Sequence, residues 1–109
     1  MPSADDPTPL ALKDALAFLE ASRGRRAMVE LGYGAWTLAR FPLQVDDADL
    51  DQEFLTVIGD VSDLGDAVLF SEVNLPLAQE GGYEISISIG EMRLESTEGM
   101  RLAVTLLGA

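Results

Sequence analysis

The one clear helical pattern in this sequence lies near its beginning, over residues 9–22. Apolar side chains recur there at the three- and four-residue spacing of an amphipathic helix. Thr8 before Pro9 predicts an N-cap followed by a proline at the first helical position, and Gly24 is expected to end the helix. Because parallel strands need repeated helical crossovers and no comparable helix follows, the downstream strand patterns favour an antiparallel sheet.

Alternating apolar and polar residues predict strands in the rest of the chain. The alternation is clearest in residues 83–89, where Tyr83, Ile85, Ile87 and Ile89 share one face. Further strands are expected at residues 27–31, 35–41, 67–73, 92–95 and 102–107, with Pro42 ending the second and Pro76 the third. Turns are expected at Gly32-Tyr33-Gly34 and at Thr97-Glu98-Gly99. The prediction is an α+β fold with an N-terminal helix packed on a mainly antiparallel β-sheet of about five to six strands.

Residues 46–64 fit two structures. A helical stripe is formed by Leu50, Phe54, Val57, Ile58 and Val61, and the aspartates that precede it suit a helix N-terminus. Residues 54–58, however, are equally typical of a β-branched strand that ends at Gly59. We favour a short helix at the acidic start of this segment.

Length and composition are those of one globular domain, since the 109 residues are 48% apolar and 24% charged. Residues 1–8 are expected to form a flexible leader before a single α+β domain over residues 9–109. The leader lacks the basic and apolar regions of a signal peptide, and no apolar run approaches the roughly 18 residues of a membrane helix. The expected location is therefore the cytoplasm.

The chain has neither histidine nor cysteine. This excludes a Ser-His-Asp triad, a thiolate nucleophile, a zinc ribbon and an iron–sulfur cluster. We predict no catalytic residues, no cofactor and no metal site. A small enzyme or ligand-binding domain that uses carboxylates as acid and base is an alternative, but no two of the 19 acidic residues are singled out by apolar flanks and a shared face.

The formal net charge is −12, and it is distributed unevenly along the chain. Residues 1–40 contain five basic and five acidic side chains, so that the whole excess lies after Phe41. A charge of this sign repels phosphates, and neither nucleic acid nor a membrane surface is an expected partner. A decoy that mimics nucleic acid is a further alternative, although much of the acidic region alternates with apolar residues.

Two motifs imitate ligand sites without completing them. Asp47-Ala48-Asp49-Leu50-Asp51 begins like a calcium loop, but Gln52 stands where the loop needs glycine and Ile58 where it needs glutamate. Gly32-Tyr33-Gly34 lacks the third glycine of a dinucleotide fingerprint. We interpret the first motif as solvated or helix-starting aspartates and the second as a hairpin turn.

Two groups of side chains are candidate partner contacts. Arg23, Arg25 and Arg26 form the only basic cluster, for which favourable charge placement at a helix end is the preferred reading and an anion or acidic partner surface the alternative. Tyr33 and Trp36 are expected to belong to the core, as a lone tryptophan in a small domain usually does. An exposed Trp36 beside Tyr33 would instead be a hot spot for a partner.

The function best supported by the sequence is a non-catalytic protein–protein interaction or adaptor module. In size, charge and α+β content the chain resembles small acidic chaperones of bacterial secretion systems, a resemblance of bulk properties that no motif carries. Residues 102–107 are apolar on both faces and need cover, which favours a homodimer or a protein partner.

Overall fold

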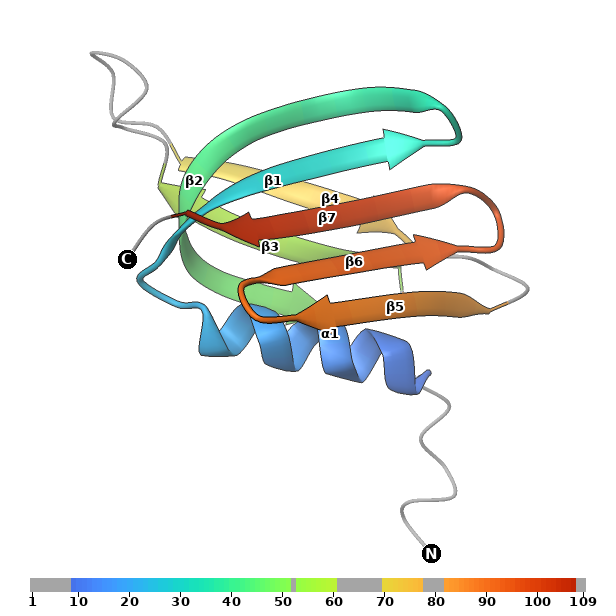
Figure 1. Cartoon of the computed structure of the whole chain (residues 1–109), viewed down its shortest axis with the longest axis horizontal. Helices are drawn as coiled ribbons and strands as arrows, with labels where there is room; N and C mark the ends of the chain where they lie inside the picture. Colours follow the sequence, from blue (N-terminus) through green and yellow to red (C-terminus); the bar gives the residue numbers. More distant parts are fainter. Residues whose placement is uncertain (1–8, 52, 61–69, 78–81, 108–109) are drawn as a thin grey trace, which may run out of the picture.

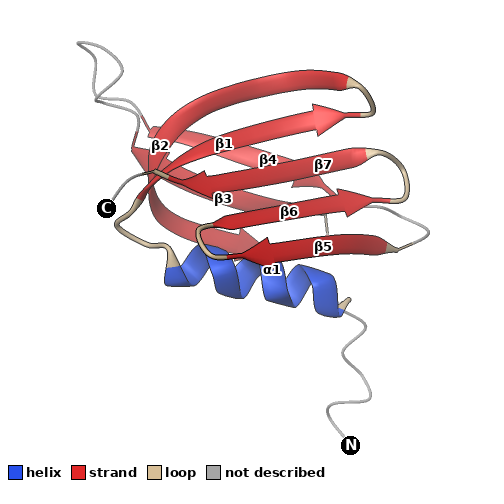
Figure 2. Cartoon of the chain, in the orientation of Figure 1, coloured by secondary structure: helices blue, strands red, loops and turns tan. Residues whose placement is uncertain are grey.

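The computed structural model describes residues 9–51, 53–60, 70–77 and 82–107. One helix precedes seven strands, which form a single antiparallel sheet in the order β4-β3-β2-β1-β7-β6-β5 (Figure 2). The elements are α1 (Leu10–Ala21), β1 (Arg26–Tyr33), β2 (Trp36–Leu50), β3 (Phe54–Asp60), β4 (Phe70–Pro76), β5 (Tyr83–Ser88), β6 (Glu91–Ser96) and β7 (Met100–Leu106). The predicted α+β class is confirmed, with slightly more strands than the five or six expected.

Helix α1 lies almost where the sequence places it. It begins at Leu10, because Pro9 occupies the N-cap position with an extended backbone instead of the first helical position. The predicted cap Thr8 and the rest of the leader lie outside the described residues. Gly24 has the expected positive φ, +82°, two residues beyond the C-cap Ser22. No helix in the described part of the chain is long and apolar enough to span a membrane.

Strand β2 bends the sheet over onto itself. Its first half, residues 36–43, pairs only with β1, and its second half, from Gln44 onward, pairs with β3. A β-bulge interrupts the register between Val45 and Asp47, where such a feature increases bending and twist. The result is a front layer of β5, β6, β7, β1 and residues 36–43, and a back layer of residues 44–50, β3 and β4 (Figure 1).

The core lies between the two layers and is closed along one side by α1, which contacts β5 and β6 of the front layer and β2 and β3 of the back layer (Figure 1). Alternate residues of the strands point into it, as in other stacked sheets. Its largest fully buried side chains are Leu19, Leu43, Leu55, Leu75, Met92, Leu94, Leu102, Val29, Val45, Val57 and Val104. Among the described residues, the outward face of the front layer and the polar side chains of the back layer lie outside this core.

The short helix favoured within residues 46–64 is wrong. Residues 44–50 continue β2, and β3 follows after a turn at Asp51. Leu55 and Val57 are fully buried two residues apart, so the period of two describes this segment and the helical stripe does not. Pairing with β2 and β4 on both sides outweighs the local preference of the aspartates for a helix start.

Two smaller expectations also fail. Pro42 does not end its strand, because β2 passes through it where the strand has a neighbour on one side only, a position at which proline is tolerated. Ile89 does not share the buried face of β5, since it lies in the turn after Ser88 and is fully exposed. The turns at Gly34 and Gly99 are confirmed, and both glycines have positive φ.

Gly59 is required where the back layer crosses the bend. A Cβ placed there would lie 2.5 Å from the carbonyl oxygen of Gln44 and 2.5 Å from Cδ1 of Leu43. We expect Gly59→Ala to lower the free energy of unfolding by about 1–3 kcal/mol, because the layers must move apart to admit the methyl group. Gly82→Ala is the control, since a Cβ there has nothing within 4 Å. Urea titration measures both, and equal stability of the two variants would contradict the close approach.

Candidate functional site

Three large apolar side chains are exposed together at the end of the β1–β2 hairpin. Trp36 is 73% exposed, Leu38 58% and Tyr33 50%. Tyr33 pairs with Trp36 in the register of the two strands, and Leu38 lies two residues further along β2. We call these three residues the hairpin patch. The prediction that Trp36 and Tyr33 belong to the core is therefore wrong, although Phe41 does pack against the core from a half-buried position.

A second β-bulge accounts for the exposure of Leu38. Leu31 pairs with Ala39 and Gly32 with Thr37, which leaves Leu38 without an opposite residue in β1. The β1–β2 turn lies at the same end of the front layer as the β6–β7 turn (Figure 1). Neither layer covers the hairpin patch, and nothing in the sequence pattern marks this extra residue.

Arg101 of β7 holds the hairpin in place. Its guanidinium donates hydrogen bonds to the carbonyl oxygens of Gly34 and Trp36, the second at 3.0 Å, and it lies 3.9 Å from a carboxylate oxygen of Glu30. A Cβ at Gly32 would collide with the Arg101 guanidinium, so a side chain there would displace the arginine from its position across β1. The turn is therefore fixed before any partner arrives, which reduces the entropy lost on binding.

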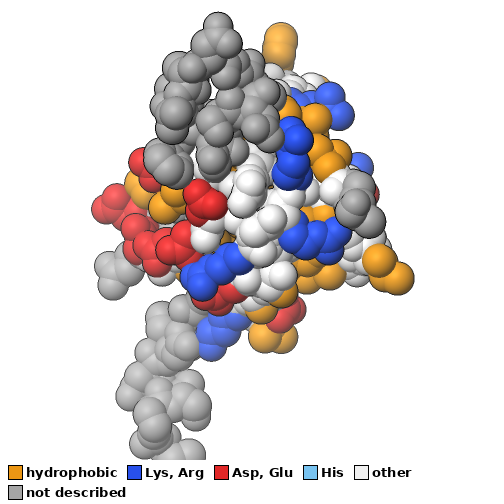
Figure 3. Space-filling view, turned by 90° about the vertical axis from the view of Figure 1, so that its left-hand side faces the viewer, with side chains coloured by type: hydrophobic (Ala, Val, Ile, Leu, Met, Phe, Trp, Pro, Cys, Tyr) orange, Lys and Arg blue, Asp and Glu red, His pale blue; other side chains and the backbone are white. Residues whose placement is uncertain are grey.

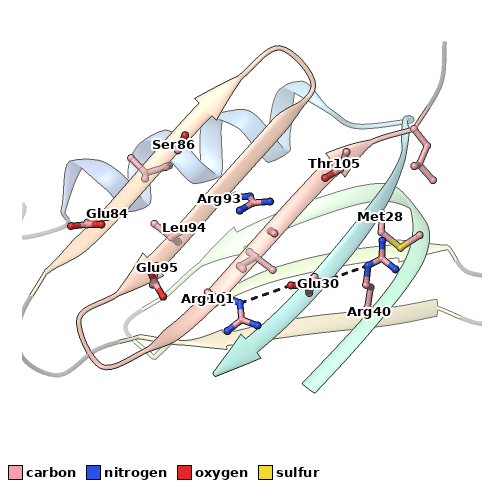
Figure 4. Close-up of a pocket in the computed structure, with 14 residues that line it drawn as sticks. Met28, Glu30, Arg40, Glu84, Ser86, Arg93, Leu94, Glu95, Arg101 and Thr105 are labelled. Atoms are coloured by element: carbon pink, nitrogen blue, oxygen red, sulfur yellow. Dashed lines mark ion pairs between the residues drawn. The ribbon is translucent and has the colours of Figure 1, made fainter. Parts of the chain in front are cut away.

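The outward face of the front layer contains a groove of about 510 Å³ next to this anchor. Figure 4 shows its side chains on the face opposite α1, with Glu30 between Arg40 and Arg101. Glu30 lies 3.6 Å from Arg40, and Arg93 lies 3.1 Å from Glu91. Each arginine of the groove thus already has a carboxylate partner, and an anionic ligand would have to compete with these pairs.

The predicted basic cluster lies elsewhere. Arg23 forms an ion pair of 2.5 Å with Asp47 and lies 3.9 Å from Glu20, so that it joins the end of α1 to β2. Arg25 and Arg26 also have interaction partners. Arg26 begins β1 and Tyr33 ends it, so the basic cluster and the hairpin patch lie roughly 25 Å apart at opposite ends of an extended strand of eight residues. The structure does not combine the two groups of candidate residues into one site.

Charge is separated between the layers as well as along the sequence. The described residues of the back layer contain six carboxylates with placed side chains and no basic residue: Asp46, Asp47, Asp49, Asp51, Glu53 and Glu72. All seven lysines and arginines belong to α1, the following loop and the front layer. Figure 3 shows acidic side chains gathered on the left of that view, with basic ones in the centre and on the right. The described back layer is therefore the more negative side of the molecule.

Two carboxylates of the segment that imitates a calcium loop have structural roles. The backbone N–H of Ala48 and the guanidinium of Arg23 hold the pKa of Asp47 below its usual value. The backbone N–H groups of Phe54 and Glu53 lower the pKa of Asp51, which caps the β2–β3 turn through bonds of 2.7 Å. Among the described residues, no group of three or more Asp and Glu side chains converges on a point that would hold a metal ion.

Comparison of the chain with protein-family models, with curated proteins and with solved structures finds no match. The function is therefore argued from the hairpin patch, its anchor and the distribution of charge. Of these residues, sequence reasoning named Tyr33 and Trp36 and missed Leu38 and Arg101. Arg101 carried one available signal, as one of two basic residues in the otherwise acidic part of the chain after Phe41.

Tryptophan fluorescence tests the geometry of the hairpin, because Trp36 is the only tryptophan. We expect the emission of an indole in water and ready quenching by acrylamide. Arg101→Met should lower the fluorescence anisotropy and reduce the free energy of unfolding by about 1–3 kcal/mol, since hydrogen bonds to a charged group are lost. Arg93→Met, which removes an exposed pair with Glu91, is the control. Blue-shifted emission, or equal effects of the two variants, would contradict the assignment.

The pH dependence of stability tests the two structural aspartates. A carboxyl group whose pKa is lower in the folded state stabilises the fold above its unfolded pKa, and this stabilisation is lost as the pH falls through the folded value. With a usual pKa of 3.8 for Asp47 and Asp51, we expect loss of stability below about pH 4 and little change between about pH 6 and 8. In urea titrations, the double variant Asp47→Asn, Asp51→Asn should lose less stability below about pH 4 than the wild type does, and Asp49→Asn should behave like the wild type. An unchanged loss of stability in the double variant would rule out a structural role for the two aspartates.

Proposed function

We propose that the chain is a non-catalytic protein-interaction module of the adaptor or chaperone type, and that the hairpin patch is its contact surface. The observation that carries the proposal is the exposure of Tyr33 and Trp36 as a cross-strand pair, with the exposed Leu38 two residues further along β2. Tryptophan and tyrosine are enriched among the residues that dominate binding energy at protein interfaces. Clustered exposed apolar groups on a folded domain mark such surfaces more often than scattered ones do.

The surroundings of the hairpin patch support this proposal. Arg101 holds the turn through two main-chain carbonyl groups, so that the side chains are presented on a fixed backbone. Tyr33 and Trp36 lie on the same face of the hairpin as the core residue Val29 and its neighbour Leu31, whereas the ion pair of Glu30 and Arg40 lies on the opposite, outward face. The two aromatic side chains thus continue the apolar face of the sheet to the end of the hairpin.

The alternatives from sequence have less support. A carboxylate general acid needs a raised pKa, whereas the pKa values of Asp47 and Asp51 are lowered. A nucleic-acid decoy needs uninterrupted rows of carboxylates, whereas Glu30 and Glu91 on the outward face each lie within 4 Å of an arginine. The six carboxylates of the described back layer are the observation that favours a decoy, but two of them, Asp47 and Asp51, are already bonded within the fold.

Capture from a lysate of the source cells tests the proposal with the full chain as bait. Trp36→Ala should reduce recovery of a specific partner by at least about tenfold, the effect of losing one interface hot spot. Ile89→Ala is the matched control, because Ile89 is also a large exposed apolar residue but lies at the β5–β6 turn. The same set of captured proteins in equal amounts with both variants would refute the hairpin patch as the contact surface.

A further inference from the structure

One long edge of the sheet is unpaired within the described part of the chain. Residues 36–43 of β2 pair with β1, but β3 joins β2 only from Gln44 onward. The first half of β2 therefore presents main-chain N–H and C=O groups at the upper rim of the front layer (Figure 1). Pro42 fits this arrangement, because prolines within sheets are confined to edges and bulges. We call residues 36–43 the free edge.

The free edge and the hairpin patch overlap at the start of β2. Trp36 and Leu38 lie on the free edge itself, and Tyr33 pairs with Trp36 from the neighbouring strand. An unpaired strand edge recognises another extended chain through main-chain hydrogen bonds, and adjacent apolar side chains select what that chain carries. The occupant of such a surface is a β-strand.

We propose that an extended segment of another protein binds as an additional strand along residues 36–41, with its apolar side chains on the hairpin patch. The inference rests on the proposed interaction function and specifies the partner. Residues 36–41 precede Pro42, which has no N–H to donate. The added strand would extend the front layer at the end that lies opposite β5 in that layer.

The size of the hairpin patch favours a peptide segment over a second copy of this chain. A large aromatic side chain buries about 150–250 Å² when fully covered, so three partly exposed side chains contribute on the order of 400 Å². A stable interface between two folded proteins needs about 800 Å² from each partner. Association of two copies would also bring together two chains that each carry a net charge of −12. Strand addition supplies the missing affinity through main-chain hydrogen bonds.

The acidic residues beyond the free edge also predict the charge of the peptide segment that would bind. Beyond the free edge, β2 continues into the exposed Asp46 and Asp49, and the described back layer has no basic side chain. A segment that pairs antiparallel with β2 would bring its N-terminal end toward these aspartates. We therefore expect apolar residues at alternate positions of the segment and lysine or arginine at its N-terminal end.

The probe is a displayed library of random peptides about twelve residues long, which is enough to cover the free edge. The library is selected on the full chain, and the best peptide is then titrated against the wild type, Trp36→Ala and Ile89→Ala. We expect alternating apolar residues with basic residues at the N-terminal end, binding that Trp36→Ala weakens at least tenfold, and no effect of Ile89→Ala. Replacing single peptide N–H groups by N-methyl should weaken binding at least tenfold at alternate positions only.

Any other result of the peptide experiment overturns strand addition. Some of these results leave the proposed protein-interaction function intact. Binding that depends on Trp36 but tolerates N-methylation at every position would show side-chain recognition alone, which keeps the interaction function and removes the added strand. Enrichment of no peptide, or of peptides indifferent to Trp36→Ala, would overturn the inference, and capture from the lysate would still decide the function. A dimer in sedimentation that Trp36→Ala dissociates would identify a second copy as the occupant.

Discussion

The bend of β2 is the constraint on which the rest of the structure depends. One strand of 15 residues belongs to both layers, because its first half pairs with β1 and its second half with β3. The bulge between Val45 and Asp47 makes the bend, and Gly59 allows the strands to approach at that point. A single sheet thereby buries one face on itself, and one short helix is enough to close the remaining side.

The same bend produces the binding surface. Because β3 leaves β2 at Gln44, residues 36–43 retain an open edge, and the hairpin at their start carries the exposed Tyr33 and Trp36. Arg101 then fixes this hairpin from β7 by crossing over Gly32. The fold has thus placed its most exposed aromatic side chain on a well-held segment beside unpaired main chain. Most isolated exposed apolar residues need no functional explanation, but this combination does.

Local sequence patterns predicted the helix and the turns. Long-range strand pairing decided the structure of the ambiguous segments. The helix near residues 10–21 and the turn at Gly99 follow from spacing and glycine, which act within a few residues. Residues 46–64 were misread because acidic residues and β-branched residues favour different local structures, and the pairing of β3 with β2 and β4 selects between them. Trp36 was assigned to the core on residue type alone, whereas it lies at the end of the β1–β2 hairpin and is 73% exposed.

Residue-by-residue amide hydrogen exchange of the free protein tests the central claim, that β2 changes its partner from β1 to β3 at Gln44 and leaves residues 36–43 paired on the β1 side only. We predict slow exchange of the amides of residues 44–50 that are directed toward β3, and of Val45, whose N–H donates to the carbonyl oxygen of Arg25. Along residues 36–43, amides directed away from β1 should exchange nearly as fast as those of an unstructured chain, while those directed toward β1 exchange slowly. Uniform protection along the whole of β2 would contradict a free edge, and with it the account of how this fold recognises a partner.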